Sequence, residues 1–133
     1  MKVHHIGYLV SDMKDALKEF RRLGYEVRQE TMYDPLRNIN ICFVENGSTL
    51  VELIEPGKDC ALFTKLHRKI GNAPYHIGYI TDIGRGGLER KLEELQTNGY
   101  ILVQPPETAI ALGSMKAAFL MNTDAGLIEV IGD

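Results

Sequence analysis

His5-Ile6-Gly7-Tyr8-Leu9-Val10, near the start of the chain, returns past its middle as His76-Ile77-Gly78-Tyr79-Ile80-Thr81. Each copy is a short, mostly apolar run with a histidine at its head and an aspartate soon after it. An internal repeat of this kind sets the architecture of a chain, because each copy takes the same place in its own structural unit. The repeat therefore predicts two similar halves, each beginning with an interior β-strand.

The residues that follow the first copy predict the order strand, helix, strand, strand, strand. A helix is expected from residue 13 to Gly24, because Ser11 or Asp12 can cap its start and apolar residues then recur at helical spacing. Asn46-Gly47-Ser48 predicts a hairpin turn between the last two strands. The expected strands of this half are residues 3–10, 25–32, 38–45 and 49–54.

The second copy is followed by the same order of elements, after a linking helix predicted at residues 60–71. The second repeat's helix ends at Gly99, and its start is expected near Gly87 because glycines weaken its first turn. The Pro-rich stretch 105–114 is expected to be a loop. The expected strands are residues 75–81, 100–104, 115–122 and 126–131. The prediction is one α+β domain over residues 1–133, with module one at 1–57, the linking segment at 58–73 and module two at 74–133.

Composition narrows the classes of function. The chain has 133 residues and a formal net charge of -3, without a basic patch, which argues against a partner nucleic acid or membrane surface. Neither a signal peptide nor a membrane-spanning apolar stretch is recognisable in the sequence, and a cytoplasmic location is expected. Cys42 and Cys60 lack zinc-finger or redox spacing and are interpreted as free thiols.

Four polar residues stand where the pattern predicts burial. His5 and His76 head the two repeated strands, and Glu52 and Glu129 interrupt the two most apolar strands of the chain. An unpaired buried carboxylate costs several kcal/mol (order of magnitude), so each glutamate needs a partner or a cation. A single residue of this kind is usually an ordinary core or surface group, but matched pairs at matched positions are not explained in that way.

One divalent cation is the simplest partner for the two carboxylates, with the two histidines completing the ligand set. Two imidazoles and two carboxylates suit Zn²⁺, Co²⁺, Ni²⁺, Mn²⁺ or Fe²⁺. Octahedral coordination by four protein ligands leaves two positions for water or substrate, which is typical of a catalytic site. The sequence therefore predicts one metal site formed by His5, Glu52, His76 and Glu129.

The sequence resembles the vicinal oxygen chelate superfamily, also called the glyoxalase/bleomycin-resistance fold, over nearly its whole length. Among its members it is most similar to methylmalonyl-CoA epimerase-like and glyoxalase-like proteins. The resemblance implies two βαβββ modules that form a curved, half-open mixed sheet around one metal ion. The resemblance is carried by His5-Ile6-Gly7, Val51-Glu52-Leu53-Ile54-Glu55-Pro56, Tyr75-His76-Ile77, Ala118-Phe119-Leu120 and Gly126-Leu127-Ile128-Glu129.

The resemblance also implies a chemistry and roles for individual residues. It implies proton abstraction next to a metal-bound carbonyl, by a glyoxalase-like lyase or an epimerase-like isomerase, with Glu129 as both metal ligand and base. Asn40 stands nearest to the second base of the epimerases and cannot take a proton. Tyr8 and Tyr79 are expected to pack or to line the pocket rim. The expected substrate is a small molecule such as a CoA thioester or a hemithioacetal, and a homodimer is expected.

Two other functions remain open. A bleomycin-resistance type protein would bind an antibiotic or another small molecule without a metal, and the four predicted ligands argue against it. A ring-cleaving dioxygenase would hold Fe²⁺ with two histidines and one carboxylate, and Glu52 would be an extra ligand in such a site.

Overall fold

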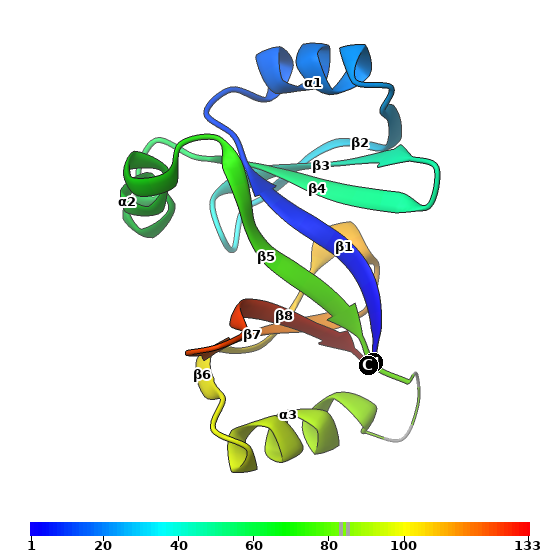
Figure 1. Cartoon of the computed structure of the whole chain (residues 1–133), viewed down its shortest axis with the longest axis vertical. Helices are drawn as coiled ribbons and strands as arrows, with labels where there is room; N and C mark the ends of the chain where they lie inside the picture. The colour runs from blue at the N-terminus through cyan, green and yellow to red at the C-terminus, as the bar shows by residue number, and fades with distance from the viewer. Residues whose placement is uncertain (83, 85) are drawn as a thin grey trace. The chain divides into compact units, whose positions relative to one another are not determined.

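The computed structural model describes residues 1–82, 84 and 86–133, and all of these side chains except that of Leu62. Within these residues the chain forms eight strands, three α-helices and one short 3₁₀-helix (Figure 1). The elements of the first half are β1 Lys2–Leu9, α1 Met13–Arg22, β2 Glu26–Asp34, β3 Ile39–Asn46, β4 Thr49–Pro56 and α2 Ala61–Ile70. Those of the second half are β5 Ala73–Ile80, α3 Gly87–Thr97, β6 Ile101–Thr108, η1 Ile110–Leu112, β7 Lys116–Asn122 and β8 Gly126–Gly132.

In the first half hydrogen-bonded neighbouring strands follow the order β2-β3-β4-β1, and in the second half they follow the order β5-β8-β7-β6. β1 pairs in parallel with β4, and β5 pairs in parallel with β8. The hairpins β2–β3, β3–β4, β6–β7 and β7–β8 are antiparallel. The predicted α+β class and the repeated βαβββ order are confirmed.

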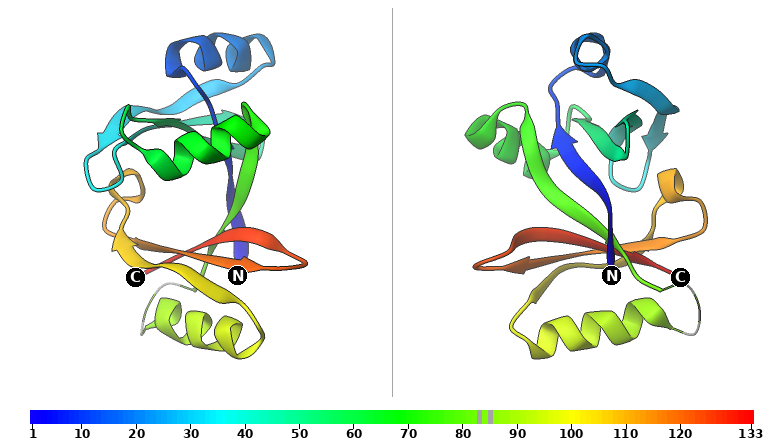
Figure 2. Two further views of the ribbon diagram at one scale, coloured as in Figure 1. Left: turned by 90° about the vertical axis from the view of Figure 1, so that its left-hand side faces the viewer. Right: turned by 45° about the vertical axis from the view of Figure 1, so that its right-hand side comes forward.

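Contacts divide the chain into two compact units. One unit is His5–Tyr75, and the other joins Met1–His4 to His76–Asp133. In each unit one helix lies along a face of the antiparallel strands, α1 over β3 and β4 and α3 over β8 (Figure 2). Each unit therefore has a helix-covered face and an opposite face, and strand alternation assigns every side chain to one of the two.

Helix α1 forms because its sequence supplies a cap and an apolar face. The side chain of Asp12 accepts a hydrogen bond from the backbone N–H of Asp15 at 2.8 Å, as expected of an N-cap. The helix buries Met13 and Ala16 against the sheet. The core of this unit consists of Val10, Met13, Ala16, Cys42, Val44, Val51 and Leu53.

Helix α3 repeats this packing in the other unit. It begins at Gly87, as predicted, after Gly86, whose φ of 67° is left-handed. Its buried residues Leu88 and Leu92 pack on Ala118, Leu120, Ile128 and Val130. A second, smaller cluster joins Ala109, Ala117 and Ile131 with side chains that include Leu112 of η1.

The prediction for residues 100–114 was wrong in one respect. Strand β6 continues to Thr108, through Pro105 and Pro106, where a loop was expected. The two prolines fall where the β6–β7 register shifts, between Gln104 and Glu107. β6 is also the last strand in the sheet order, where a missing backbone donor is tolerated. No helix in the described part of the chain is long and apolar enough to span a membrane.

Candidate metal and active site

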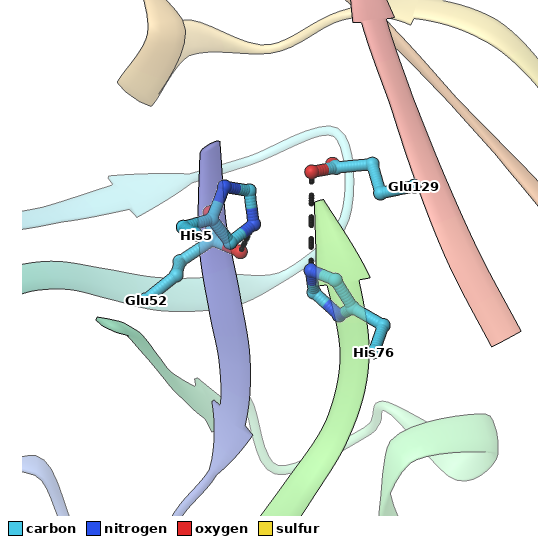
Figure 3. A group of neighbouring side chains, drawn as sticks. All are labelled: His5, Glu52, His76 and Glu129. Carbon is cyan, nitrogen blue, oxygen red and sulfur yellow. Dashed lines mark ion pairs between the residues drawn. The ribbon is translucent and has the colours of Figure 1, made fainter. Parts of the chain in front are cut away.

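The first predicted pair, His5 and Glu52, lies within the unit His5–Tyr75. Glu52 stands opposite Gly7 in the parallel β1–β4 pair, so His5, two residues earlier on β1, projects from the same face. The Nε2 atom of His5 is 3.2 Å from Oε2 of Glu52 (Figure 3). Both side chains are buried, with 1% and 5% of their residue surfaces exposed.

The second predicted pair, His76 and Glu129, has the same construction in the other unit. Glu129 stands opposite Gly78 in the parallel β5–β8 pair, and His76 again lies two residues before that glycine. The Nε2 atom of His76 is 3.8 Å from Oε2 of Glu129 (Figure 3). His76 is 3% exposed and Glu129 is 5% exposed.

A phenylalanine accompanies each pair. Phe43 is the cross-strand neighbour of Glu52, and its ring stands edge-on to His5 with a centroid distance of 5.5 Å. Phe119 is the cross-strand neighbour of Glu129, and its ring stands edge-on to His76 at 5.1 Å. Each imidazole is thus held between a carboxylate and an aromatic ring, which restricts its rotation.

The glycines of the repeat explain why the histidine and the glutamate of each pair can lie close together. Gly7 and Gly78 are the direct neighbours of the two glutamates on the parallel strands. Neither glycine has a side chain to separate the carboxylate from the imidazole two residues away. The four residues Gly7, Gly78, Phe43 and Phe119 were not predicted as part of the site. The signal was present, since both copies of the repeat read His-Ile-Gly.

Each pair has the donor atoms of a divalent cation site. An imidazole nitrogen and a carboxylate oxygen are the ligands that suit mid-series divalent metals. Two ligands at right angles, with metal–ligand bonds of about 2.1 Å, stand about 3.0 Å apart. The 3.2 Å separation of His5 and Glu52 is close to this value, and His76 and Glu129 at 3.8 Å need only a small rotation to reach it. The chemistry and the spacing of both pairs fit a metal.

The remaining predicted site residues lie on the helix-covered faces. Tyr8 packs edge-on against Phe20 of α1, with ring centroids 5.1 Å apart. Tyr79 packs on the core cluster beneath α3. By strand alternation both tyrosines project away from the face that carries the histidine of their own strand.

Asn40 belongs to a different network. Its Nδ2 atom donates to Oε1 of Glu55 at 2.7 Å, and the other oxygen of Glu55 accepts from the backbone N–H of Met13. Asn40 alternates in phase with Cys42 and Val44, which pack beneath α1. The opposite face of β3, on the side of Glu52, presents Ile39, Ile41, Phe43 and, next to the hairpin turn, Glu45, whose carboxylate lies 3.8 Å from Nε of Arg28.

The family model of the glyoxalase/bleomycin resistance protein/dioxygenase superfamily matches residues 4–119. No curated protein matches the sequence.

Several solved structures share the fold. The hypothetical protein BH1468 from Bacillus halodurans C-125 is 24% identical, with a TM-score of 0.84 over 99% of this chain and 94% of that one. A variant of Streptomyces coelicolor methylmalonyl-CoA epimerase in complex with 2-nitronate-propionyl-CoA is 17% identical, with a TM-score of 0.80 over 100% and 94%. Methylmalonyl-CoA epimerase from Mycobacterium tuberculosis is 18% identical, with a TM-score of 0.80 over 98% and 87%. At these identities the likeness shows the fold alone.

Proposed function

Because the chain belongs to the glyoxalase/bleomycin resistance protein/dioxygenase superfamily, we propose that it is a metal-dependent enzyme that abstracts a proton next to a substrate carbonyl. The observation that carries this proposal is the repetition of one buried histidine–glutamate pair, with the same neighbours, in both halves. A buried ion pair with no ligand to bind is a poor way to stabilise a core. Its occurrence at equivalent places supports a function that both pairs share.

We propose that the two pairs together hold one divalent cation through His5, Glu52, His76 and Glu129. The ion would be Zn²⁺, Co²⁺, Ni²⁺, Mn²⁺ or Fe²⁺, all of which accept mixed nitrogen and oxygen ligands. When bound, such an ion supplies Lewis-acid stabilisation of the negative charge that develops on the substrate oxygen. The bleomycin-resistance type and the dioxygenase remain the alternatives, and metal content separates the first of them from the present proposal.

Glu129 is the proposed base. Its neighbours on β8 are Ile128 and Val130, Phe119 faces it across the strands, and it is 5% exposed. A carboxylate positioned beside the reacting carbon can act as a general base. Glu129 would take the proton from the carbon beside the carbonyl and return it to the product.

The placement of Asn40 helps to choose between the two proposed reactions, glyoxalase-like isomerisation and epimerisation. Two-base epimerisation needs a second proton carrier, and the one ionisable side chain on the face of β3 that carries Phe43 is Glu45, which adjoins the hairpin turn and lies 3.8 Å from Nε of Arg28. A single base that removes and returns the proton on one side suits a glyoxalase-like isomerisation. We therefore place the glyoxalase-like reaction ahead of epimerisation, with hemithioacetals as the first substrates to test and CoA thioesters next. A small-molecule substrate and a homodimer complete the proposal.

The decisive experiment is metal analysis of protein purified without a chelator or a nickel column. The wild type is compared with His5→Ala and Glu129→Gln, and with His67→Ala as a control histidine on α2, whose ring contacts Asn72. About one metal per chain in the wild type and the control, lost in both site variants, supports the site. Exchange of substrate protons in D₂O, lost in Glu129→Gln even when the metal is restored, supports the role of the base.

The opposite result is equally clear. A wild-type protein that contains no metal and takes up neither Co²⁺ nor Ni²⁺ contradicts the enzyme proposal and favours the metal-free binding protein. Melting temperatures of the variants show whether each is folded when its metal content is measured.

A further inference from the structure

A second polar pocket lies at the start of α3, within the unit that contains His76–Asp133. It has a volume of about 310 Å³ and is lined by Met1, Thr81, Asp82, Gly87, Arg90, Lys91 and Glu94. Thr81 directly follows β5 and is 6% exposed, and its Oγ1 atom has no hydrogen-bond partner among the residues that the structure describes. A buried hydroxyl without a partner is costly, so this atom indicates a missing ligand.

The pocket is separate from the metal site proposed above. The Oγ1 atom of Thr81 would lie 3.5 Å from a Cβ built on Gly87, the first residue of α3, and so points to the helix-covered face. His76 lies on β5 five residues before Thr81, and by alternation it projects from the opposite face. A ligand in this pocket would therefore require neither the metal nor the base proposed above.

The first half of the chain provides an internal reference for this pocket. The N–H of Val10 donates to the carbonyl of Ile54 at 2.9 Å, and the N–H of Thr81 donates to that of Ile131 at 2.8 Å, so Val10 and Thr81 are equivalent. The ends of the two helices correspond as well. Tyr25 donates its N–H to the carbonyl of Phe20, and Tyr100 donates to that of Leu95, both at 3.0 Å.

Carboxylates of the protein itself occupy the start of the helix in the first half. Asp12 accepts from the N–H of Asp15, and Glu55 accepts from the N–H of Met13. These bonds satisfy donors that every helix leaves unpaired at its first turn. The first half therefore shows which chemical group this position of the fold binds, namely a carboxylate oxygen.

The second half lacks both carboxylates. Counting back from the matched helix ends, Gly87 takes the place of Asp12, and counting along the last strand, Gly132 takes the place of Glu55. α3 accordingly begins without a side-chain cap. By the same count, Arg90 and Lys91 replace Asp15 and Ala16. Glu89 replaces Lys14 in the same way, so the formal charge of these positions changes from -2 in the first half to +1 in the second.

We propose that this pocket binds a small oxyanion, the phosphate or carboxylate group of a ligand, in the place that Asp12 and Glu55 fill in the first half. The first-turn amides of α3 and the hydroxyl of Thr81 donate hydrogen bonds to it, and Arg90 neutralises its charge. The positive end of the helix dipole favours the same sign of charge.

The two acidic residues of the pocket, Asp82 and Glu94, do not cancel the positive charge that Arg90 offers to an anion. Glu94 is already paired with Lys91, whose Nζ atom lies 2.5 Å from its Oε2 atom. Asp82 is exposed, and solvent screens its repulsion. Arg90 is then the charged side chain, among the described residues lining the pocket, that is left to meet an anion.

The test is a titration of the full, chelator-treated chain with inorganic phosphate, and separately with acetate, followed by amide NMR. Removing the metal prevents phosphate from reporting on the other site. Saturable shifts are expected at the amides of Gly87, Leu88 and Glu89 and not at those of Met13 and Lys14, whose helix start is already occupied. Stronger binding of phosphate identifies a phosphate group as the ligand, and stronger binding of acetate identifies a carboxylate.

Three variants make the test specific. Arg90→Gln and Thr81→Val should each weaken phosphate binding about tenfold, the usual effect of losing one hydrogen bond to a charged group. Thr81→Val installs the residue found at the equivalent position, Val10, and should leave the melting temperature of the free protein unchanged or higher. Lys14→Gln, at the first turn of α1, is the matched control and should bind phosphate as the wild type does.

Three results would overturn the proposal. The first is the absence of saturable shifts at the start of α3 with either anion. The second is equal shifts at both helix starts, which would indicate a general effect of salt. The third is wild-type affinity in Arg90→Gln, a variant on an exposed position that should fold whatever the outcome for Thr81→Val.

Discussion

The carboxylate of Glu55 accepts a hydrogen bond from the backbone N–H of Met13, so the end of β4 holds the first turn of α1. The other oxygen of the same carboxylate accepts from Asn40 on β3. One glutamate thus joins a helix to two strands. It stands three residues after Glu52, and strand alternation puts the two carboxylates on opposite faces, one for the helix and one for the proposed metal.

Replacing this glutamate should cost stability and leave the metal site intact. We expect Glu55→Ala to lower the free energy of unfolding by about 1–2 kcal/mol, because it removes a helix cap and leaves the amide of Asn40 without its acceptor. Urea denaturation measures the loss, with Glu45→Ala on β3 as a control. An unchanged midpoint would show that the hydrogen bonds of Glu55 contribute nothing to folding.

Asn40→Asp distinguishes a structural role of this position from a catalytic one. The new carboxylate would face that of Glu55, and the two like charges should destabilise the protein at neutral pH and less so in acid, where one of them is protonated. No epimerisation of methylmalonyl-CoA should appear. A gain of epimerase activity would instead place residue 40 beside the reacting carbon.

The phenylalanines should matter for metal binding beyond their contribution to packing. Because the ring of Phe119 stands edge-on to His76, Phe119→Leu should loosen the imidazole and reduce metal affinity about tenfold. Phe20→Leu is the matched control, since Phe20 belongs to α1 and packs on the core cluster between that helix and the strands. It should lower the melting temperature without changing the metal affinity of the folded chain. Isothermal titration with Co²⁺ compares the two, and equal affinities would remove Phe119 from the site.

The alkaline side of the stability profile should depend on Cys42. Burial raises the pKa of this thiol in the folded protein. A raised pKa means that its contribution to stability is complete below the ordinary thiol pKa and is lost as the pH rises through the folded value. Cys42→Ala should therefore flatten the loss of stability above that pH, whereas Cys60→Ala should not. Denaturation midpoints measured across this range, identical in slope for both variants, would contradict the expectation.

The sequence was sufficient to predict the bounds of helices whose capping residues and glycines act locally. Asp12 and Gly24 bounded α1 correctly, and the glycines before residue 87 correctly delayed the start of α3. The extension of β6 through Pro105 was not predictable, because only the sheet order reveals that the strand lies at an edge. From the local sequence a proline predicts the end of a strand, and only its position at a sheet edge or bulge makes it tolerable within one.

Strand β3 shows a different limit of prediction from sequence. Its middle is apolar on both faces, with Ile41 and Phe43 on one face and Cys42 and Val44 on the other. A strand of this kind gives no alternation from which to decide where Asn40 projects. The histidine–glutamate pairs could be predicted because the same pattern occurs in both halves of the sequence. Asn40 belongs to no such repeated pattern. Whether the two pairs bind one metal stays a prediction.

The division of the chain into units sets an order of events during synthesis. The unit His5–Tyr75 is one continuous segment. The other unit joins Met1–His4, which are translated before that segment, to His76–Asp133, which are translated after it. Since chains emerge from the N-terminus, the first unit can fold while translation continues. Met1–His4 can join their own unit only after His76–Asp133 have been translated.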